Sequence, residues 1–149
     1  MFRRIKDIRE DNDLSQEFIA DKLGCSRRNY SNIENGTSLI TLSQLNAFAN
    51  LFNRSTDYIV GLTNSKSLNE DNKDYNLKII SKRLIELRLE KGLSQMQIVE
   101  KVISVSQSTY SRYEDGISTI GILTLISLAK YYKVSLDYLL GRTDIRDKY

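Results

Sequence analysis

The clearest pattern of apolar and polar positions lies between residues 16 and 36, where two short helices are predicted around one glycine. The first helix covers residues 16–23, and its apolar positions recur at helical spacing on one face. Gly24 then allows a backbone turn that a residue with a side chain would resist. Ser26 is placed to cap the second helix, which runs to about Glu34 with its apolar residues inward. This arrangement has the spacing of a helix-turn-helix.

The same pattern returns in the second half of the chain. Leu93-Ser94-Gln95 repeats Leu14-Ser15-Gln16 at an offset of 79, and Asp137-Tyr138 repeats Asp57-Tyr58 at an offset of 80. The offset changes because the second copy has one extra residue near its turn, which either lengthens the turn or bulges the helix before it. Two copies indicate tandem domains rather than a solenoid.

The other apolar positions predict three further helices in each copy, with no strand signal. We therefore expect an all-α chain made of two tandem five-helix domains, covering residues 1–63 and 75–143. Residues 64–74 are polar and charged without an apolar period, which predicts a linker. The charged end of the chain is expected to fray from Arg142, and residues 144–149 form a tail outside the second domain.

Several helices are predicted to begin at a capping residue. Thr41 with Gln44, and Ser94 with Gln97, have the spacing of a capping box, in which each side chain satisfies a backbone N–H of the other residue. Ser106 is placed to cap the third helix of the second copy, as Ser26 is in the first.

The first helix-turn-helix resembles that of the lambda-repressor-like (Cro/CI type, xenobiotic-response-element) family of bacterial and phage regulators. The residues that carry the resemblance are Leu14-Ser15-Gln16, Ile19-Ala20, Leu23-Gly24, Ser26, Ser31 and Glu34-Asn35-Gly36. The resemblance implies a sequence-specific DNA-binding regulator of transcription, in which the third helix of one or both domains enters the major groove. Family habit alone favours a repressor over an activator, since the chain shows no obvious effector or activation segment.

The family's contact positions, carried onto the first copy, give polar side chains that include two arginines. Arginine can donate two hydrogen bonds to guanine, and asparagine can pair with adenine. At the Gln16 position the family places a side chain that contacts phosphate and supports a residue of the third helix. The candidate DNA contacts of the first copy are Gln16, Ser26, Arg27, Arg28, Asn32, Asn35 and Thr37. The alternative for Arg27 and Arg28 is an ordinary solvated pair, which the helix-turn-helix context disfavours.

The second copy offers a less basic set of polar side chains and departs from the family pattern. Its candidate DNA contacts are Gln95, Gln107, Ser108, Thr109 and Arg112. Val99 replaces the closely packed Ala20, and Ile103-Ser104 replaces the single turn glycine. DNA contact and a purely structural role therefore both stay open for this copy.

Two ion pairs are implied by the same resemblance. Arg9 and Glu34 in the first copy recur as Arg88 and Glu114 in the second. In the family, residues at these places pair and hold the first helix against the third, so we expect them to be structural.

The charge of the chain agrees with a nucleic-acid partner but does not establish one. The 149 residues carry a net charge of +3, with residues 1–63 neutral and residues 77–149 at +4. Because a solvated surface explains such a charge equally well, the expectation of double-stranded DNA as partner depends on where the basic residues fall.

The composition argues against several other classes of protein. The absence of histidine and the single cysteine provide no ligand set for zinc and no internal disulfide, so no metal or cofactor is expected. No nucleophile–base pair or paired carboxylates suggest an enzyme. No apolar run approaches the roughly 18 residues of a membrane span, and the charged N-terminus does not resemble a signal peptide. We expect a cytoplasmic protein without a membrane partner.

Alternatives remain for the assembly and for the function. In one alternative for the assembly, a single chain takes the place of a dimer and binds two unequal half-sites. In the other, the first copy binds DNA and the second copy forms a homodimer. A rival function is a protein–protein interaction module, antitoxin-like or an anti-repressor adaptor, that uses the same helices against another protein.

Overall fold

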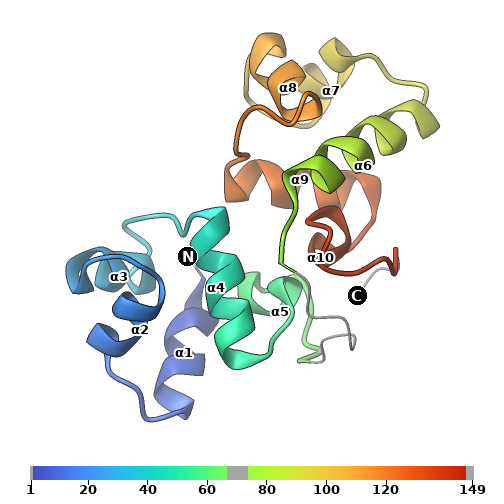
Figure 1. Ribbon diagram of the computed structural model, residues 1–149. Helices are drawn as coiled ribbons and strands as arrows, with labels where there is room; N and C mark the ends of the chain where they lie inside the picture. Colours follow the sequence, from blue (N-terminus) through green and yellow to red (C-terminus); the bar gives the residue numbers. More distant parts are fainter. Residues whose placement is uncertain (1, 67–73, 147–149) are drawn as a thin grey trace. The chain divides into compact units, whose positions relative to one another are not determined.

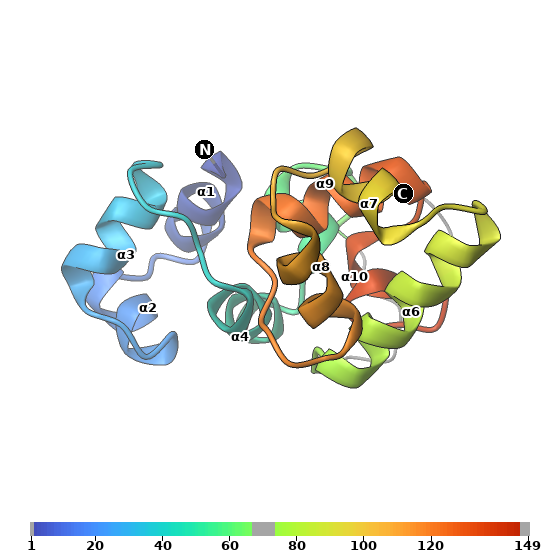
Figure 2. The ribbon, with the colours of Figure 1, turned by 90° about the horizontal axis from the view of Figure 1, so that it is seen from above.

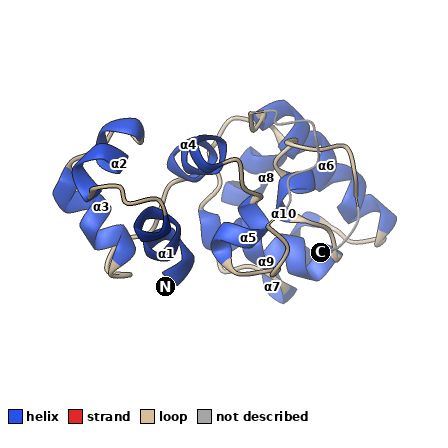
Figure 3. Ribbon diagram, turned by 90° about the horizontal axis from the view of Figure 1, so that it is seen from below, coloured by secondary structure: helices blue, strands red, loops and turns tan. Residues whose placement is uncertain are grey.

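The computed structural model describes residues 2–66 and 74–146 of the chain. The chain divides into two compact units, one up to residue 72 and one from residue 73, called unit 1 and unit 2 below (Figure 1). Every regular element of the described residues is a helix, which confirms the predicted all-α fold (Figure 3). The predicted linker, residues 64–74, lies mostly outside the described residues, as does the end of the predicted tail.

Unit 1 contains five helices within its described residues. They are α1 (Arg3–Asp11), α2 (Gln16–Lys22), α3 (Arg27–Glu34), α4 (Leu42–Phe52) and α5 (Thr56–Val60). α2 packs against α3, and α1 packs against α3 and α5. The core between them includes Ile5, Tyr30 and Phe48, each fully buried. Five helices of this length close one core because each contributes a single apolar face.

Polar caps fix where the helices of unit 1 begin. Ser15, Ser26 and Ser55 each accept a hydrogen bond from a backbone N–H in the first turn of the following helix. Thr41 and Gln44 form the predicted capping box at the start of α4. Each such cap satisfies a backbone donor that the helix cannot satisfy itself.

Unit 2 repeats this helix order in its described residues. Its helices are α6 (Leu77–Glu90), α7 (Gln95–Lys101), α8 (Gln107–Glu114), α9 (Ile122–Tyr132) and α10 (Leu136–Leu139). Figure 2 shows α8 beside α6 and α7, the counterparts of α1 and α2. Ser94 and Gln97 form the second predicted capping box, and Ser106 caps α8. Val99 of α7 is half-buried.

The extra residue of the second copy lies in the turn and leaves the preceding helix unchanged in length. α2 and α7 each span seven residues. In unit 1 the turn passes through Gly24 at φ +66°, and the N–H of Cys25 donates to the Ala20 carbonyl at 2.9 Å. In unit 2 no residue between 102 and 106 has a positive φ, and Ile103 is buried. The longer turn therefore reaches α8 without the left-handed conformation that favours glycine.

The expectation that the chain frays from Arg142 is wrong for residues 142–146. Arg142 and Thr143 are buried, and Arg142 Nε donates to Asp137 Oδ1 at 2.9 Å. Arg146 forms an ion pair with Glu90, with one of its two hydrogen bonds at 3.0 Å. Charge alone indicated a solvated end, but the carboxylate of Asp137 offsets the desolvation of the buried Arg142, and Glu90 pairs with Arg146 at the surface.

None of the helices in residues 2–66 and 74–146 is long and apolar enough to cross a membrane.

Candidate nucleic-acid interface

α3 presents its polar side chains away from the core of unit 1. Ser26 Oγ accepts from the Asn29 N–H at 3.1 Å and so fixes the first turn of the helix. Tyr30 points inward and is fully buried, whereas Arg27 and Arg28 are exposed at the start of the helix. Neither arginine forms an ion pair within the described part of the chain. Their positive charges are therefore available to an anionic partner.

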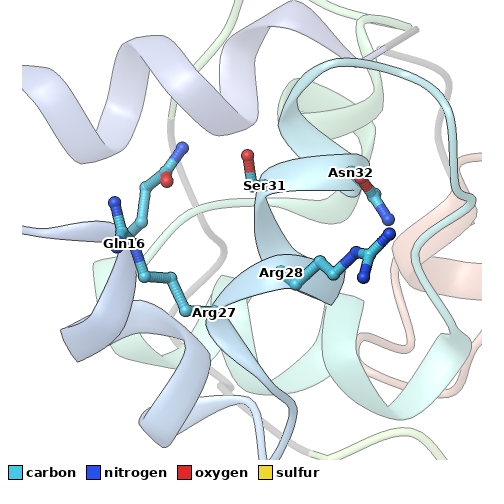
Figure 4. A pocket seen from close by; sticks show the side chains of 5 residues that line it. All are labelled: Gln16, Arg27, Arg28, Ser31 and Asn32. Atoms are coloured by element: carbon cyan, nitrogen blue, oxygen red, sulfur yellow. The ribbon is translucent and has the colours of Figure 1, made fainter.

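Five side chains from α2 and α3 line a shallow hollow of about 250 Å³ on this face. They are Gln16, Arg27, Arg28, Ser31 and Asn32. Figure 4 shows Gln16 beside Arg27, and Arg28 with Asn32 extending to the same side of α3. Four of the five were predicted as DNA contacts from the sequence, and Ser31 was named only as part of the motif.

A buried carboxylate holds α1, α2 and α3 together behind this hollow. The Glu34 side chain is 1% exposed and accepts hydrogen bonds from Arg9, with Nε to Oε1 at 2.5 Å and Nη2 to Oε2 at 3.1 Å. Gln16 Nε2 also donates to Glu34 Oε2, at 2.8 Å. Arg9 Nη1 donates in addition to the Leu14 carbonyl at 2.9 Å. The start of α2 is thereby fastened to the end of α3.

The ionised form of Glu34 is stabilised by this cluster. Burial alone raises the pKa of the Glu34 carboxyl, but the hydrogen bonds from Arg9 and Gln16 outweigh it and hold the pKa below its ordinary value. In unit 2 the hydrogen bonds from Arg88 and Gln95 likewise outweigh burial and lower the pKa of the Glu114 carboxyl.

Three predicted contacts of unit 1 lie outside the hollow. Ser26 uses its hydroxyl to cap α3. Asn35 is exposed just after α3, with its amide nitrogen 3.5 Å from Ser31 Oγ. Thr37 Oγ1 donates to the Asn32 carbonyl at 3.2 Å, which folds the segment after α3 back onto the helix. Asn35 and Thr37 therefore follow α3 in the chain but do not line the hollow.

Unit 2 reproduces the internal cluster. Arg88 Nε donates to Glu114 Oε1 at 2.6 Å and Nη2 to Oε2 at 2.9 Å. Gln95 Nε2 donates to Glu114 Oε2 at 2.9 Å, as Gln16 does to its own glutamate. α8 is thus held against α6 and α7 by the same set of bonds that holds α3.

The outward side chains at the start of α8 are uncharged. Gln107 and Ser108 are exposed at the positions that correspond to the two arginines of α3. The Ser106 hydroxyl lies 3.0 Å from Ser108 Oγ and 2.8 Å from Thr109 Oγ1, so the three hydroxyls hydrogen-bond among themselves. The first turn of α8 therefore has no positively charged side chain.

Arg112 is the remaining candidate of unit 2. It is exposed, and its Nε donates to Ser118 Oγ at 2.9 Å, which ties the segment after α8 to the helix. It occupies the position of Asn32 in unit 1.

The sequence analysis did not single out Arg4 and Arg83, whose contacts match between the two units. Arg4 lies 4.5 Å from the Tyr58 ring centroid and donates to the Tyr58 carbonyl at 2.7 Å. Arg83 lies 4.0 Å from the Tyr138 ring centroid and donates to the Thr143 carbonyl at 2.8 Å. The recurrence of an arginine and a tyrosine at matching places in both copies was the available signal.

The described residues hold no group of three or more His, Cys, Asp or Glu side chains placed to bind a metal ion.

Comparisons with known proteins place both copies in one family. The family model described as "Helix-turn-helix" matches residues 5–59 and again residues 84–139. The chain is 35% identical over 69 residues to the HTH-type transcriptional regulator ImmR of Bacillus subtilis (strain 168), which is 46% of this chain and 54% of that protein. It is 40% identical over 65 residues to the uncharacterized HTH-type transcriptional regulator YobD of the same organism, 44% of this chain and 57% of that one.

A third relative is the uncharacterized HTH-type transcriptional regulator RC0668 of Rickettsia conorii (strain ATCC VR-613 / Malish 7), 37% identical over 59 residues, 40% of this chain and 46% of that protein. The aligned region thus spans about half the length of each of these curated relatives. No solved structure matches the chain. Because the family model covers most of the chain in two tandem copies, this chain belongs to the Cro/CI-type (xenobiotic-response-element) helix-turn-helix family.

Proposed function

We propose that this chain is a sequence-specific DNA-binding regulator of transcription, and that it acts as a repressor. In this proposal α3 of unit 1 enters the major groove. The observation that carries it is the exposed face of α3, where Arg27, Arg28 and Asn32 share one hollow with Gln16. The relatives named as HTH-type transcriptional regulators support the same function.

The residue types on this face suit the edges of base pairs. Arg27 and Arg28 carry guanidinium groups that can donate two hydrogen bonds each to guanine O6 and N7. The Asn32 amide matches adenine N6 and N7. A solvent-exposed arginine without a carboxylate partner is also stabilised beside a phosphate. Where no guanine is within reach, either arginine therefore contacts the DNA backbone instead.

Gln16 has a positioning role and a contact role in this proposal. One of its amide hydrogens is engaged by Glu34, which sets the side chain at the rim of the hollow. The remaining polar atoms of the amide then meet a phosphate beside the groove. Asn35 and Thr37, exposed after α3, are proposed to contact the backbone on the far side of the helix.

Selection of bound sequences from a randomised duplex pool tests the proposal. We expect the full chain to enrich a defined sequence, and Arg27→Ala/Arg28→Ala to lose it. Affinity for the selected duplex should fall with salt at a slope of about −0.9 per phosphate contact in a plot of log K against log salt. Absence of enrichment even at low salt would contradict DNA binding and favour the protein–protein interaction module.

The same selection asks whether unit 2 binds DNA, as predicted for Gln95, Gln107, Ser108, Thr109 and Arg112. Two different half-sites, one of them lost with Arg112→Ala, would mean that both units contact DNA. A palindrome lost only with the Arg27/Arg28 variant would mean that unit 1 binds DNA and unit 2 assembles the protein.

A further inference from the structure

The first turn of α3 is hydrogen-bonded to the capping box at the start of α4. In that capping box the Thr41 N–H donates to Gln44 Oε1 at 3.0 Å. The other end of the same amide, Gln44 Nε2, donates to Asn29 Oδ1 at 3.4 Å, which is a long and therefore weak hydrogen bond. Ser26 Oγ accepts from the backbone N–H of Asn29 at 3.1 Å. Asn29 is thus held through its backbone by the cap of α3 and through its side chain by α4.

These contacts decide which end of the Asn29 amide is engaged. A backbone N–H can only donate, so Gln44 turns its oxygen toward Thr41 and its NH2 group toward Asn29. The Asn29 oxygen then faces Gln44, because the reverse orientation would set one NH2 group against another. Asn29 is half-buried, and its Nδ2 has no hydrogen-bond partner among residues 2–66 and 74–146. Asn29 therefore offers the donor end of its amide to a partner outside the chain.

Asn29 lies beside the proposed base-contacting side chains rather than among them. Successive residues of a helix are turned by about 100° around its axis. Asn29 is one such step beyond Arg28, and it does not line the hollow that Arg28 shares with Asn32. Its partner Gln44 belongs to α4, which contributes no residue to the hollow. When α3 enters the major groove, a side chain on this flank faces the phosphates at the wall of the groove rather than the base edges on its floor.

Unit 2 has no counterpart of this contact in its described residues. The positions of Asn29 and Gln44 are occupied there by Thr109 and Thr124, which have no amide. Thr109 Oγ1 instead lies 2.8 Å from the Ser106 hydroxyl. Both units nevertheless share the serine cap of the third helix and the buried ion pair at its end. Because the fold forms without the bond between the two amides, packing alone does not account for their presence in unit 1.

We propose that Asn29 is a further DNA-contacting residue of α3, which donates a hydrogen bond to a phosphate oxygen, and that Gln44 is the positioning residue that turns its NH2 group outward. A phosphate oxygen can only accept, so it matches the donor end of the amide. Contacts of this kind fix the register of a protein on the duplex. The inference rests on the proposed function and adds to it a residue outside the contacts that the family resemblance implies.

Fluorescence anisotropy of the full chain on its selected duplex tests the contact. Asn29→Ala should lower affinity by about fivefold, a loss typical of one hydrogen bond. The slope of log K against log salt should stay unchanged, because a neutral amide displaces no counterion. The selected sequence should also stay the same, since a phosphate contact has no sequence information. If Asn29→Ala binds the duplex as tightly as the wild type does, this inference is wrong while the proposed function stands.

A double-mutant cycle tests the positioning role of Gln44. Gln44→Ala should lower affinity in the wild-type background but cause no further loss in the Asn29→Ala background, because no amide is then left to orient. Gln97→Ala is the matched control, since it removes the capping box of α7 and should leave affinity unchanged. An equal loss from Gln44→Ala in both backgrounds would mean that Gln44 acts only through the stability of α4, and would overturn its positioning role.

Replacing one phosphate of the duplex at a time by an uncharged methylphosphonate locates the contact. At one position the replacement should weaken the wild type clearly more than Asn29→Ala, because only the wild type has a donor there. The phosphate contact is wrong if no position behaves in this way, or if Asn29→Ala changes the base that is preferred at one position. A wild type that enriches no sequence at low salt contradicts the proposed function itself, and this inference with it.

Discussion

Unit 1 and unit 2 share an internal scaffold but differ in the chemistry of their outward helix. Glu34 and Glu114 each accept three hydrogen bonds, from one arginine and one glutamine. On the outer face, α3 has Arg27 and Arg28 where α8 has Gln107 and Ser108. The comparison shows that the two units hold their third helix with the same buried bonds but present different side chains on its outer face.

The turns between the paired helices differ as well. Unit 1 uses Gly24 in a left-handed conformation, and unit 2 uses a longer turn with Ile103 buried beneath it. Both solutions bring the third helix against the second, because the turn need only reverse the chain and cover the core. The two units thus pack their second and third helices together through turns of different length.

The largest expected effect on DNA affinity comes from replacing the two arginines of α3. Arg27→Ala/Arg28→Ala should lower affinity for the selected duplex by about 100-fold or more, because a bidentate arginine–guanine pair is worth about 1–3 kcal/mol and the proposal gives each arginine such a contact. Gln107→Ala/Ser108→Ala in unit 2 should change affinity by less than about threefold, a change within ordinary surface effects. Fluorescence anisotropy measures both, and equal losses would show that the two units contact DNA alike.

The buried ion pairs should be equally important in the two units. Glu34→Gln and Glu114→Gln should each lower the stability of their own unit by about 3 kcal/mol, because a largely buried arginine loses its counter-charge. Amide hydrogen exchange in α3 and in α8 resolves the two units separately.

DNA binding by Glu34→Gln should weaken only as far as unit 1 unfolds. Complete loss of binding with unchanged protection of α3 would mean that Glu34 itself belongs to the binding surface.

Acid should destabilise both units in parallel. The pKa values of Glu34 and Glu114 lie below the ordinary value of 4.5 in the folded protein. Their contribution to stability is therefore complete above that ordinary value and is lost as the pH falls through the folded pKa values.

Melting temperatures should stay level from pH 7 to about 5.5 and fall below about pH 4. The stability gap between the wild type and Glu34→Gln/Glu114→Gln should close over the same range. A gap that stays constant down to pH 2 would contradict the stabilised carboxylates.

The smallest expected effect concerns the turn. Gly24→Ala should destabilise unit 1 by about 1 kcal/mol, because a side chain disfavours the left-handed conformation. A Cβ at this position meets no other atom within 4 Å, so conformational strain is the whole effect. Ser104→Ala, in the longer turn of unit 2, should cost almost nothing. A loss with Ser104→Ala as large as that with Gly24→Ala would mean that the two turns do not differ in strain.

Much of the fold was predictable because its signals are local. A helix needs only apolar residues at helical spacing and a cap at its start, as at Thr41 with Gln44 and Ser94 with Gln97. The repeat itself then showed that the chain has two helix-turn-helix copies. Four of the residues that line the hollow followed from the contact positions that the family resemblance implies.

What the local pattern could not indicate is decided by tertiary packing, in part between residues far apart in the chain. Arg142 looked like the start of a charged, fraying end, yet it is buried against Asp137. Arg146 pairs with Glu90, 56 residues away in the chain. The exposure of Ile117 also became visible only once the helices were packed.

The amino-acid pattern was thus enough to predict the helices, their caps and the twofold repeat, since these features depend on neighbours within a few residues. Packing in three dimensions settled which charges are paired, such as Arg146 with Glu90, and which apolar side chains stay exposed, such as Ile117. Burial and ion pairing depend on which distant segments come together, and that information is not contained in any one stretch of sequence.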